Sequence, residues 1–243
     1  MKNILITGIS RGLGLLLTEM LLSNSHDCVI YGVSRTKSDE LNCLLERYPQ
    51  RLKWLSFDLN CLDQIEQRVF DDFIGKDTVI TDFVNNAAIL YKDLILRINI
   101  ERMEELFRVN VHAPFVLCKC VVRNFLQHKT AGSIVHLSSI CAHKGFDGLS
   151  MMGATKSAIE AFSRTLAKEY GRKGIRSNVV VVGLLDIGMG HTVNNAQMKD
   201  LFSQSALGKV TDYKSVLSMT EYLLSENANS ITGQTIHVNA GIT

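Results

Sequence analysis

Short apolar runs, often rich in β-branched residues, alternate along the chain with longer segments in which apolar residues recur every three or four positions. This alternation is typical of strands that are followed by amphipathic helices. Seven runs are predicted to be strands: Asn3–Thr7, Cys28–Val33, Leu52–Phe57, Asp82–Asn85, Ser133–Ser138, Arg176–Val182 and Thr235–Val238. Helical periodicity falls at Leu13–Ser23, Leu62–Phe73, Ile100–Gln127, Met152–Arg172 and Lys214–Ser225.

Several strand runs are almost entirely apolar, as expected for a parallel sheet that is covered on both faces. The repeated strand–helix order therefore predicts an α/β fold, a Rossmann-type doubly wound sheet of seven parallel strands with helices on both faces. The 243 residues include two prolines and contain no internal repeat, so we expect one domain over residues 1–243. Residues 183–210 are rich in Gly, Asn and Ser, and are predicted to form a flexible substrate flap.

Charge and composition exclude several classes of function. The net charge is +2 and the basic residues are scattered, so we expect no nucleic-acid partner. No apolar run approaches the roughly 20 residues of a membrane helix, and the first strand run begins close to Met1. We therefore expect no membrane span, no signal peptide and a cytoplasmic location.

The six cysteines show no CxxC spacing and several lie in apolar runs: Cys28, Cys43, Cys61, Cys118, Cys120 and Cys141. We predict reduced core thiols rather than disulfides or a metal site.

A glycine-rich turn follows the first predicted strand and opens the first helix. Its residues are Thr7, Gly8, Ile9, Ser10, Arg11, Gly12, Leu13 and Gly14. Glycines allow backbone N–H groups to approach a pyrophosphate, and the helix N-terminus adds positive potential. A purely structural turn is the alternative, but the position directly after a leading strand favours nucleotide binding.

The end of the second strand favours NADP(H) over NAD(H). An acidic residue after this strand usually binds the ribose 2′-hydroxyl, but here Ser34 and Arg35 follow, without a carboxylate. The planar guanidinium of Arg35 suits a 2′-phosphate, and Arg11 would approach it from the glycine turn. The alternative is that Arg35 is an ordinary solvated surface charge.

The glycines of the turn, Gly8, Gly12 and Gly14, have the spacing GxxxGxG. Together with motifs along essentially the whole chain, this spacing resembles the short-chain dehydrogenase/reductase family. The motifs are Asn85-Asn86-Ala87-Ala88, Asn110, Ser138-Ser139, Lys156 and the C-terminal segment from Ile231 to Asn239. Within the family the pattern is most similar to 3-oxoacyl-carrier-protein reductases and other small ketoreductases. The resemblance implies that Asp58 and Leu59 flank the adenine, that Asn86 lies near the ribose, and that Ala87, Ala88, Gly183 and Ile187 border the cofactor. Asp58 has an alternative role as a cap of the following helix.

In this family a serine polarises the substrate carbonyl, a tyrosine transfers the proton, a lysine holds the ribose and an asparagine anchors a relay water. The resemblance assigns these roles to Ser139, Lys156 and Asn110, with Ser139 thirteen residues before position 152. The tyrosine position holds Met152, and a thioether cannot donate a proton. Each residue also has a purely structural alternative, since serines form turns and most helical lysines are solvated.

Other departures lie near the same pocket. The family's Pro-Gly has become Val182-Gly183, its carboxamide-binding threonine aligns with Ile187, and its Asn-Asn-Ala-Gly ends at Ala88. The part of the cofactor site that would hold the phosphates therefore keeps the family pattern, whereas the part that would hold the nicotinamide departs from it. For a substitute proton donor, His143 is the first candidate and Tyr91 the second, with an ordinary loop residue as the alternative for each. Lys156 itself, or a water held by Lys156 and Asn110, is a further source.

Three hypotheses follow. The first is an atypical NADP(H)-dependent ketoreductase that acts on a small-molecule or acyl-carrier-bound carbonyl. The second is a catalytically impaired NADP(H)-binding subunit or sensor, and the third a lyase or isomerase on the same scaffold. The segments Ile100–Gln127 and Met152–Arg172 resemble helices that form dimer interfaces in the family, so we expect a homodimer or homotetramer. Their apolar stripes would equally fit an intrachain core.

Overall fold

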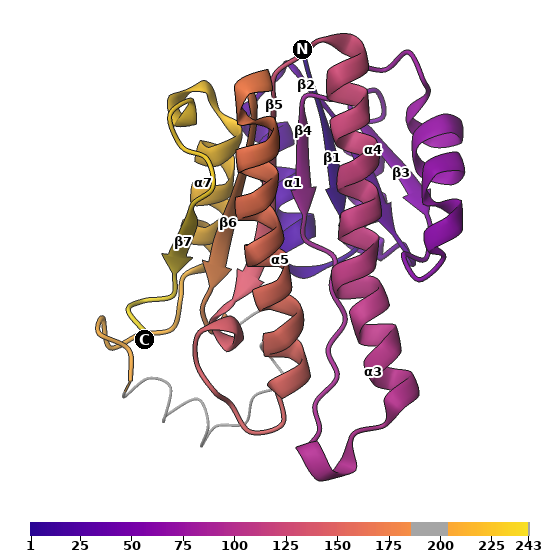
Figure 1. Cartoon of the computed structure of the whole chain (residues 1–243). Coiled ribbons are helices and arrows are strands. Elements are labelled where there is room, and N and C mark those ends of the chain that lie inside the picture. The colour runs from indigo at the N-terminus through magenta and orange to yellow at the C-terminus, as the bar shows by residue number, and fades with distance from the viewer. Residues whose placement is uncertain (186–203, 243) are drawn as a thin grey trace.

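The computed structural model describes residues 1–185 and 204–242. These residues form one sheet of seven parallel strands in the order β3-β2-β1-β4-β5-β6-β7 (Figure 1). The strands are β1 (Lys2–Thr7), β2 (Cys28–Ser34), β3 (Leu52–Ser56), β4 (Asp82–Asn85), β5 (Gly132–Ser139), β6 (Ile175–Val182) and β7 (Thr235–Val238). The predicted fold class is confirmed, and each observed strand end differs from its predicted end by at most one residue.

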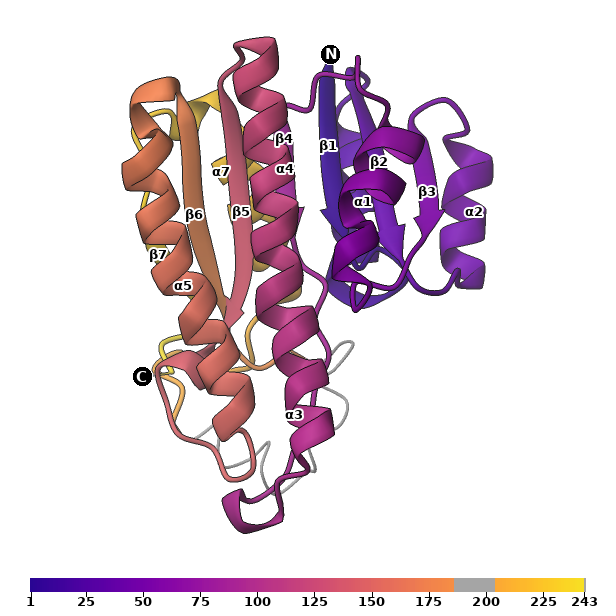
Figure 2. The same cartoon turned by 45° about the vertical axis from the view of Figure 1, so that its right-hand side comes forward.

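Helices cover both faces of the sheet, because successive side chains of each buried strand point to opposite faces. In β1, Leu5 packs toward one layer, whereas Ile4 and Ile6 pack toward the other. The first layer contains η2 (Glu66–Ile74), α4 (Ala113–His128) and α5 (Ser150–Tyr170). The second contains α1 (Gly12–Asn24), α2 (Asp39–Arg47) and α7 (Tyr213–Leu224), as the two views show (Figures 1 and 2).

The predicted helix over Ile100–Gln127 is divided into three parts. These are α3 (Ile100–Phe107), the wider π-helical turn η4 (Arg108–His112) and α4. Pro114, which lacks a backbone N–H, stands in the first turn of α4, directly after this wide turn. The wide turn matters for function because it carries Asn110.

The other helical segments also differ in detail from the periodicity. Leu62–Phe73 becomes a short η1 (Leu62–Gln64) followed by the π-helical η2. The short helix α2 was not predicted; it is capped by Ser38, whose side chain accepts a hydrogen bond from the Leu41 N–H. Short segments η3 (Ile95–Arg97), η5 (Ile140–Ala142), η6 (Gly171–Lys173) and η8 (Glu226–Ala228) complete the described elements.

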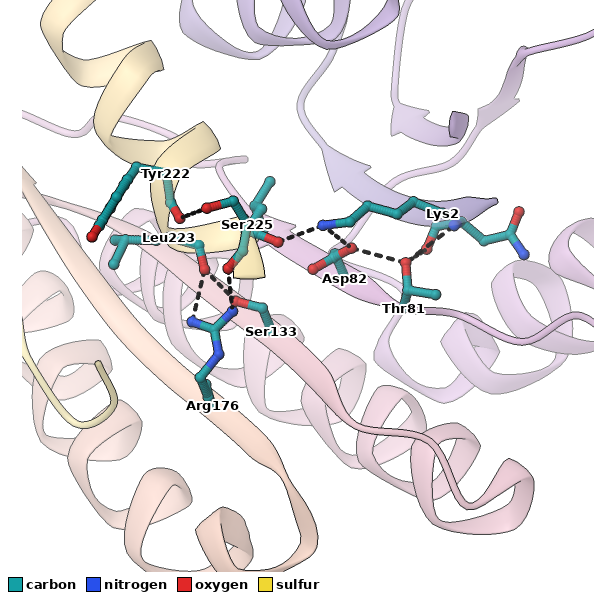
Figure 3. Close-up of polar contacts among 10 residues, drawn as sticks. Lys2, Thr81, Asp82, Ser133, Arg176, Tyr222, Leu223 and Ser225 are labelled. Atoms are coloured by element: carbon teal, nitrogen blue, oxygen red, sulfur yellow. Dashed lines mark hydrogen bonds and ion pairs between the residues drawn. The ribbon is translucent and has the colours of Figure 1, made fainter. Parts of the chain in front are cut away.

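At the amino edge of the sheet, a polar cluster holds the carboxyl end of α7 (Figure 3). The guanidinium of Arg176 donates to the carbonyls of Leu223 and Ser225 at 2.8 and 3.2 Å. The ammonium of Lys2 donates to the Leu224 carbonyl and lies 3.5 Å from the Asp82 carboxylate. Burial raises the pKa of Asp82, and the charge of Lys2 opposes this shift.

Of the cysteines, Cys28, Cys118 and Cys120 are buried, and Cys61 and Cys141 are partly buried. Cys43 is exposed on α2, so the prediction that all six are core thiols was wrong for this residue. The apolar neighbours of Cys43 in the sequence face the sheet, while Cys43 lies on the opposite side of the helix. Within residues 1–185 and 204–242, no helix is long and apolar enough to cross a membrane.

Candidate active site

The candidate residues gather at the carboxyl ends of the strands, around β1 and β4. From β1 the chain continues to β2 and β3 on one side, whereas β4 continues to β5, β6 and β7 on the other. Such a reversal of strand order opens a crevice in which ligands of doubly wound proteins bind. The segments that follow β1, β4, β5 and β6 therefore meet at one end of the molecule (Figure 1).

The glycine turn leads directly into α1 with a geometry that suits a phosphate group. Gly8 and Gly12 have φ values of 77° and 60°, which favour glycine. A Cβ at Gly14 would lie 2.2 Å from the Gly8 carbonyl oxygen, so the turn closes tightly only with glycine there. Arg11, at the N-cap of α1, provides no side-chain cap and the first turn contains no acidic residue. An anion bound at this N-terminus would pair with the first-turn amides, so the turn fits a pyrophosphate.

The turn is tied to the end of β4 by two side chains. The amide nitrogen of Asn86 donates to the carbonyls of Thr7 and Gly8 at 2.9 and 3.1 Å. The hydroxyl oxygen of Thr7 accepts from the backbone N–H groups of Asn86 and Ala87 at 3.2 and 3.1 Å. The structure thus uses the Asn86 side chain to fix the phosphate turn, next to the expected ribose position.

The end of β2 presents Arg35 to solvent, and Arg11 is also exposed. Among the described residues, neither guanidinium forms an ion pair. The hydroxyl of Ser34 donates to the Thr36 carbonyl and accepts from the Trp54 indole N–H at 2.8 Å, which fixes the backbone before Arg35. Both arginines are therefore available to an anionic group at this edge.

The expected adenine-binding pair behaves differently at its two positions. Asp58 is exposed, and its carboxylate accepts from the Asn60 N–H at 2.9 Å, which closes a local turn. Leu59 is buried in the core beside Phe57. Ser10 and Leu13 are half-buried in the glycine turn, and Leu13 packs on the core of the second layer.

The reaction centre is formed where β5 ends against α5. The hydroxyl oxygen of Ser139 accepts from the Cys141 N–H at 3.3 Å. The ammonium of Lys156 is buried and donates to the carbonyl of Leu137 at 2.8 Å, two residues before Ser139. Burial lowers the pKa of Lys156 to about 8, while the nearby groups of Cys141 and Glu160 oppose that shift.

Met152 occupies the position on α5 one turn before Lys156 and is buried. Its sulfur lies 3.6 Å from the side-chain nitrogen of Asn110. The amide of Asn110 also accepts from the Ile89 N–H at 2.9 Å and donates to the Ile89 carbonyl at 3.0 Å. The structure therefore brings Asn110 and position 152 together and fixes Asn110 on the loop after β4.

The two leading candidates for a substitute proton donor have other partners. The Nε2 of His143 lies 2.9 and 3.1 Å from the two carboxylate oxygens of Glu160. Tyr91 is buried, and its hydroxyl donates to the Asp93 carboxylate at 3.2 Å and accepts from the Asn99 N–H at 2.9 Å. These contacts hold loops together, so neither polar group is free to turn toward a carbonyl without breaking them.

Sequence reasoning missed a buried polar group beside the reaction centre. Glu160 is 4% exposed, lies four residues after Lys156 and accepts a hydrogen bond from the Ser138 hydroxyl. The signal was present, because Glu160 is the one charged residue in the run Ala158–Phe162. His136 was also missed: it is fully buried on β5, and burial, together with the charge of Lys156, lowers its pKa to about 3.

A family model described as enoyl-(acyl carrier protein) reductase matches residues 8–243. The chain belongs to the short-chain dehydrogenase/reductase family. It is 30% identical over 242 residues to the 3-oxoacyl-[acyl-carrier-protein] reductase FabG of Buchnera aphidicola subsp. Baizongia pistaciae, covering 99% of this chain and 97% of the relative. The FabG of Escherichia coli K12 is 27% identical over 241 residues, covering 99% and 97%.

Solved structures of this family share the fold. A 4-hydroxyisoleucine dehydrogenase complexed with NADH has a TM-score of 0.87 at 22% identity, covering 100% of this chain and 99% of that one. ElxO with NADP bound has a TM-score of 0.86 at 22% identity, covering 99% and 98%. The family is one of oxidoreductases that use a nicotinamide cofactor, which agrees with the glycine turn.

The remaining departures from the short-chain dehydrogenase/reductase pattern lie on two loops. Ala88 is half-buried after β4, and Val182 is buried at the end of β6. Gly183 follows Val182 with no room for a side chain, since a Cβ there would lie 2.1 Å from the Thr211 hydroxyl. Ile187 and positions 186–203 of the expected flap lie outside the described residues.

Proposed function

We propose that the protein is an NADP(H)-dependent ketoreductase for a 3-oxoacyl group or a related small carbonyl, and that Lys156 supplies the proton. One observation carries this proposal: the buried ammonium of Lys156 is held beside the end of β5 that carries Ser139. With its pKa lowered to about 8, Lys156 is mostly protonated at pH 7 and yet gives up its proton readily. A tyrosine is then not required for the proton transfer.

The residues divide the work as follows. The hydroxyl of Ser139 donates to the carbonyl oxygen and stabilises the negative charge that develops there. Lys156 passes a proton to the same oxygen, directly or through a water that it holds with Asn110, and is re-protonated from solvent. NADPH, when bound, supplies the hydride that reduces the carbonyl carbon. One hydride and one proton together convert the ketone to an alcohol.

Two features support NADP(H) as the cofactor and an acyl group as substrate. Arg35 and Arg11 offer guanidinium groups at the edge where the 2′-phosphate would lie. The two relatives described above, which align over nearly the full chain, are 3-oxoacyl-[acyl-carrier-protein] reductases. We further expect a homodimer or homotetramer through α4 and α5, where the partly exposed Phe115 stacks on Phe162 with ring centroids 3.9 Å apart.

The test measures NADPH oxidation with a 3-oxoacyl thioester and a panel of activated ketones. Replacing the proton donor in Lys156→Met is expected to lower the rate by about 10²–10⁴-fold. Ser139→Ala is expected to lower it by about 10²–10³-fold. The matched control is Lys168→Met, which removes an exposed lysine of the same helix and is expected to keep wild-type turnover.

The pH dependence follows from the sign of the proton transfer. Because the protonated form of Lys156 is the active one, the rate is expected to be constant below the pKa of about 8 and to fall above it. Tight NADPH binding without turnover on any ketone would instead support a nucleotide-binding subunit. Conversion of a substrate without NADPH oxidation would support a lyase or isomerase.

A further inference from the structure

We infer that Glu160 is a positioning residue for the reaction centre, whose buried carboxylate serves as the counter-charge of Lys156 and fixes the strand end that carries Ser139. This inference rests on the proposed role of Lys156. Under this inference, the Glu160–His143 pair affects the reaction by holding other groups in place, and neither residue contacts the substrate.

The contacts of Glu160 join three elements at one point. Its carboxylate accepts from the Ser138 hydroxyl at 2.5 Å, at the end of β5. It also pairs with the Nε2 of His143, in the segment after η5, at 2.9 Å. Glu160 itself projects from α5, so the strand end, the following segment and the helix are held by one carboxylate. Ser139 lies between Ser138 and His143 in the sequence, so fixing these two residues also fixes Ser139.

The same helix brings Glu160 close to the reacting ammonium. Residues four apart on a helix lie on one face, and Lys156 and Glu160 are both buried against β5. Lys156 donates to the carbonyl of Leu137, and Glu160 accepts from the next residue, Ser138. A buried ammonium is costly without an opposite charge nearby, and Glu160 supplies one. Accordingly, Glu160 raises the pKa of Lys156 against the effect of burial.

Within residues 1–185 and 204–242, the titratable groups that act on Glu160 or on its partners come from three elements. They are Lys156 on α5, His143 after η5 and His237 on β7, whose ring lies 4.5 Å from that of His143. Cys141 on η5 also raises the pKa of Lys156. The His143 side chain is 39% exposed and therefore contacts solvent, whereas the side chain of Glu160 is buried.

A direct test follows the titration of Lys156 rather than turnover. The full-length protein is labelled with ¹³C at the lysine ε carbons, and the signal of Lys156 is assigned by its loss in Lys156→Met. Glu160→Gln keeps the side-chain size but removes the charge, and is expected to lower the titration midpoint of Lys156 by about 1 pH unit. The control Glu169→Gln removes an exposed carboxylate of the same helix and is expected to leave the midpoint unchanged. An unchanged midpoint in Glu160→Gln would overturn the inference.

A second variant covers the case in which Glu160→Gln does not fold. Glu160→Met replaces the carboxylate by an apolar side chain of similar length, which suits a buried site, and it is expected to lower the midpoint of Lys156 by a similar amount. An unchanged midpoint in that variant would also overturn the inference.

Kinetics separate this inference from the proposed function. In Glu160→Gln the pH above which NADPH oxidation declines is expected to move down with the midpoint, whereas a purely structural defect would lower the rate at every pH. A shifted Lys156 midpoint in a protein that never oxidises NADPH would contradict the proposed function and leave the charge pairing established.

Discussion

The side-chain nitrogen of Asn110 lies 3.6 Å from the sulfur of Met152. Two hydrogen bonds to the backbone of Ile89 fix the Asn110 amide, so its orientation does not depend on the residue at position 152. A thioether is a weak acceptor, and the amide gains little from it. The surroundings of position 152 are thus built around a polar neighbour, while the side chain there has no proton to give.

Met152→Tyr is expected to raise the rate of NADPH-dependent 3-oxoacyl reduction by no more than about tenfold, well below the usual contribution of a positioned general acid, because Lys156 already supplies the proton. The new hydroxyl would lie one helical turn from Lys156, whose positive charge favours its ionisation. Met152→Phe is the control, because it introduces a similar ring without the hydroxyl. Equal rates for the two variants would show that the added ring, not the proton donor, changes turnover.

Arg35→Asp is expected to reverse the cofactor preference. The carboxylate would repel the 2′-phosphate of NADPH and accept from the 2′-hydroxyl of NADH. Measured by titration of each nucleotide, the ratio of the two dissociation constants is expected to change by at least about tenfold, equivalent to about 1.4 kcal/mol. Arg172→Asp makes the same charge change on exposed η6, which precedes β6 at the amino edge of the sheet, and should leave the ratio as it was.

Asp82→Asn tests the polar cluster below α7. Because burial raises the pKa of Asp82 in the folded protein, the folded state binds this proton more tightly than the unfolded chain. The wild type therefore loses stability as the pH rises from about 4, the unfolded pKa, through the folded pKa. The amide of the variant would not titrate, so the free energy of unfolding of Asp82→Asn, relative to wild type, is expected to increase between about pH 4 and pH 7.

Urea unfolding at several pH values measures this difference, with Asp77→Asn as the control for an exposed carboxylate. A relative stability that decreases with pH would mean that the attraction of Lys2 outweighs burial.

The strands were predictable because each one is buried on both faces and is therefore apolar at nearly every position. The run Val179–Val182 illustrates this pattern, and it forms the end of β6. Helix boundaries were less accessible. The turn at Arg108–His112 carries Asn110, which bonds to the backbone of the distant Ile89, and nothing in the local periodicity distinguishes a π-helical turn from an α-helical one.

The glycine turn could be predicted from the sequence for a different reason, since the backbone geometry at Gly8 and Gly14 requires glycine there. The role of Glu160 depends instead on side chains from β5 and from the segment after η5. His143 and Tyr91 were plausible acids by residue type, but their partners Glu160 and Asp93 emerge only when separate segments are brought together.

The order of the strands in the sequence means that the glycine turn and the reaction centre are synthesised at different times. The strands β1, β2 and β3 lie within residues 2–56, so the part of the sheet that carries the glycine turn is made before the strands that carry the reaction centre. By contrast, Ile242 belongs to the same buried cluster as Ile140, next to Ser139, and is made long after these three strands. Because contacts between distant segments form slowly, folding on the ribosome is expected to shape the phosphate turn first and to align the reaction centre last.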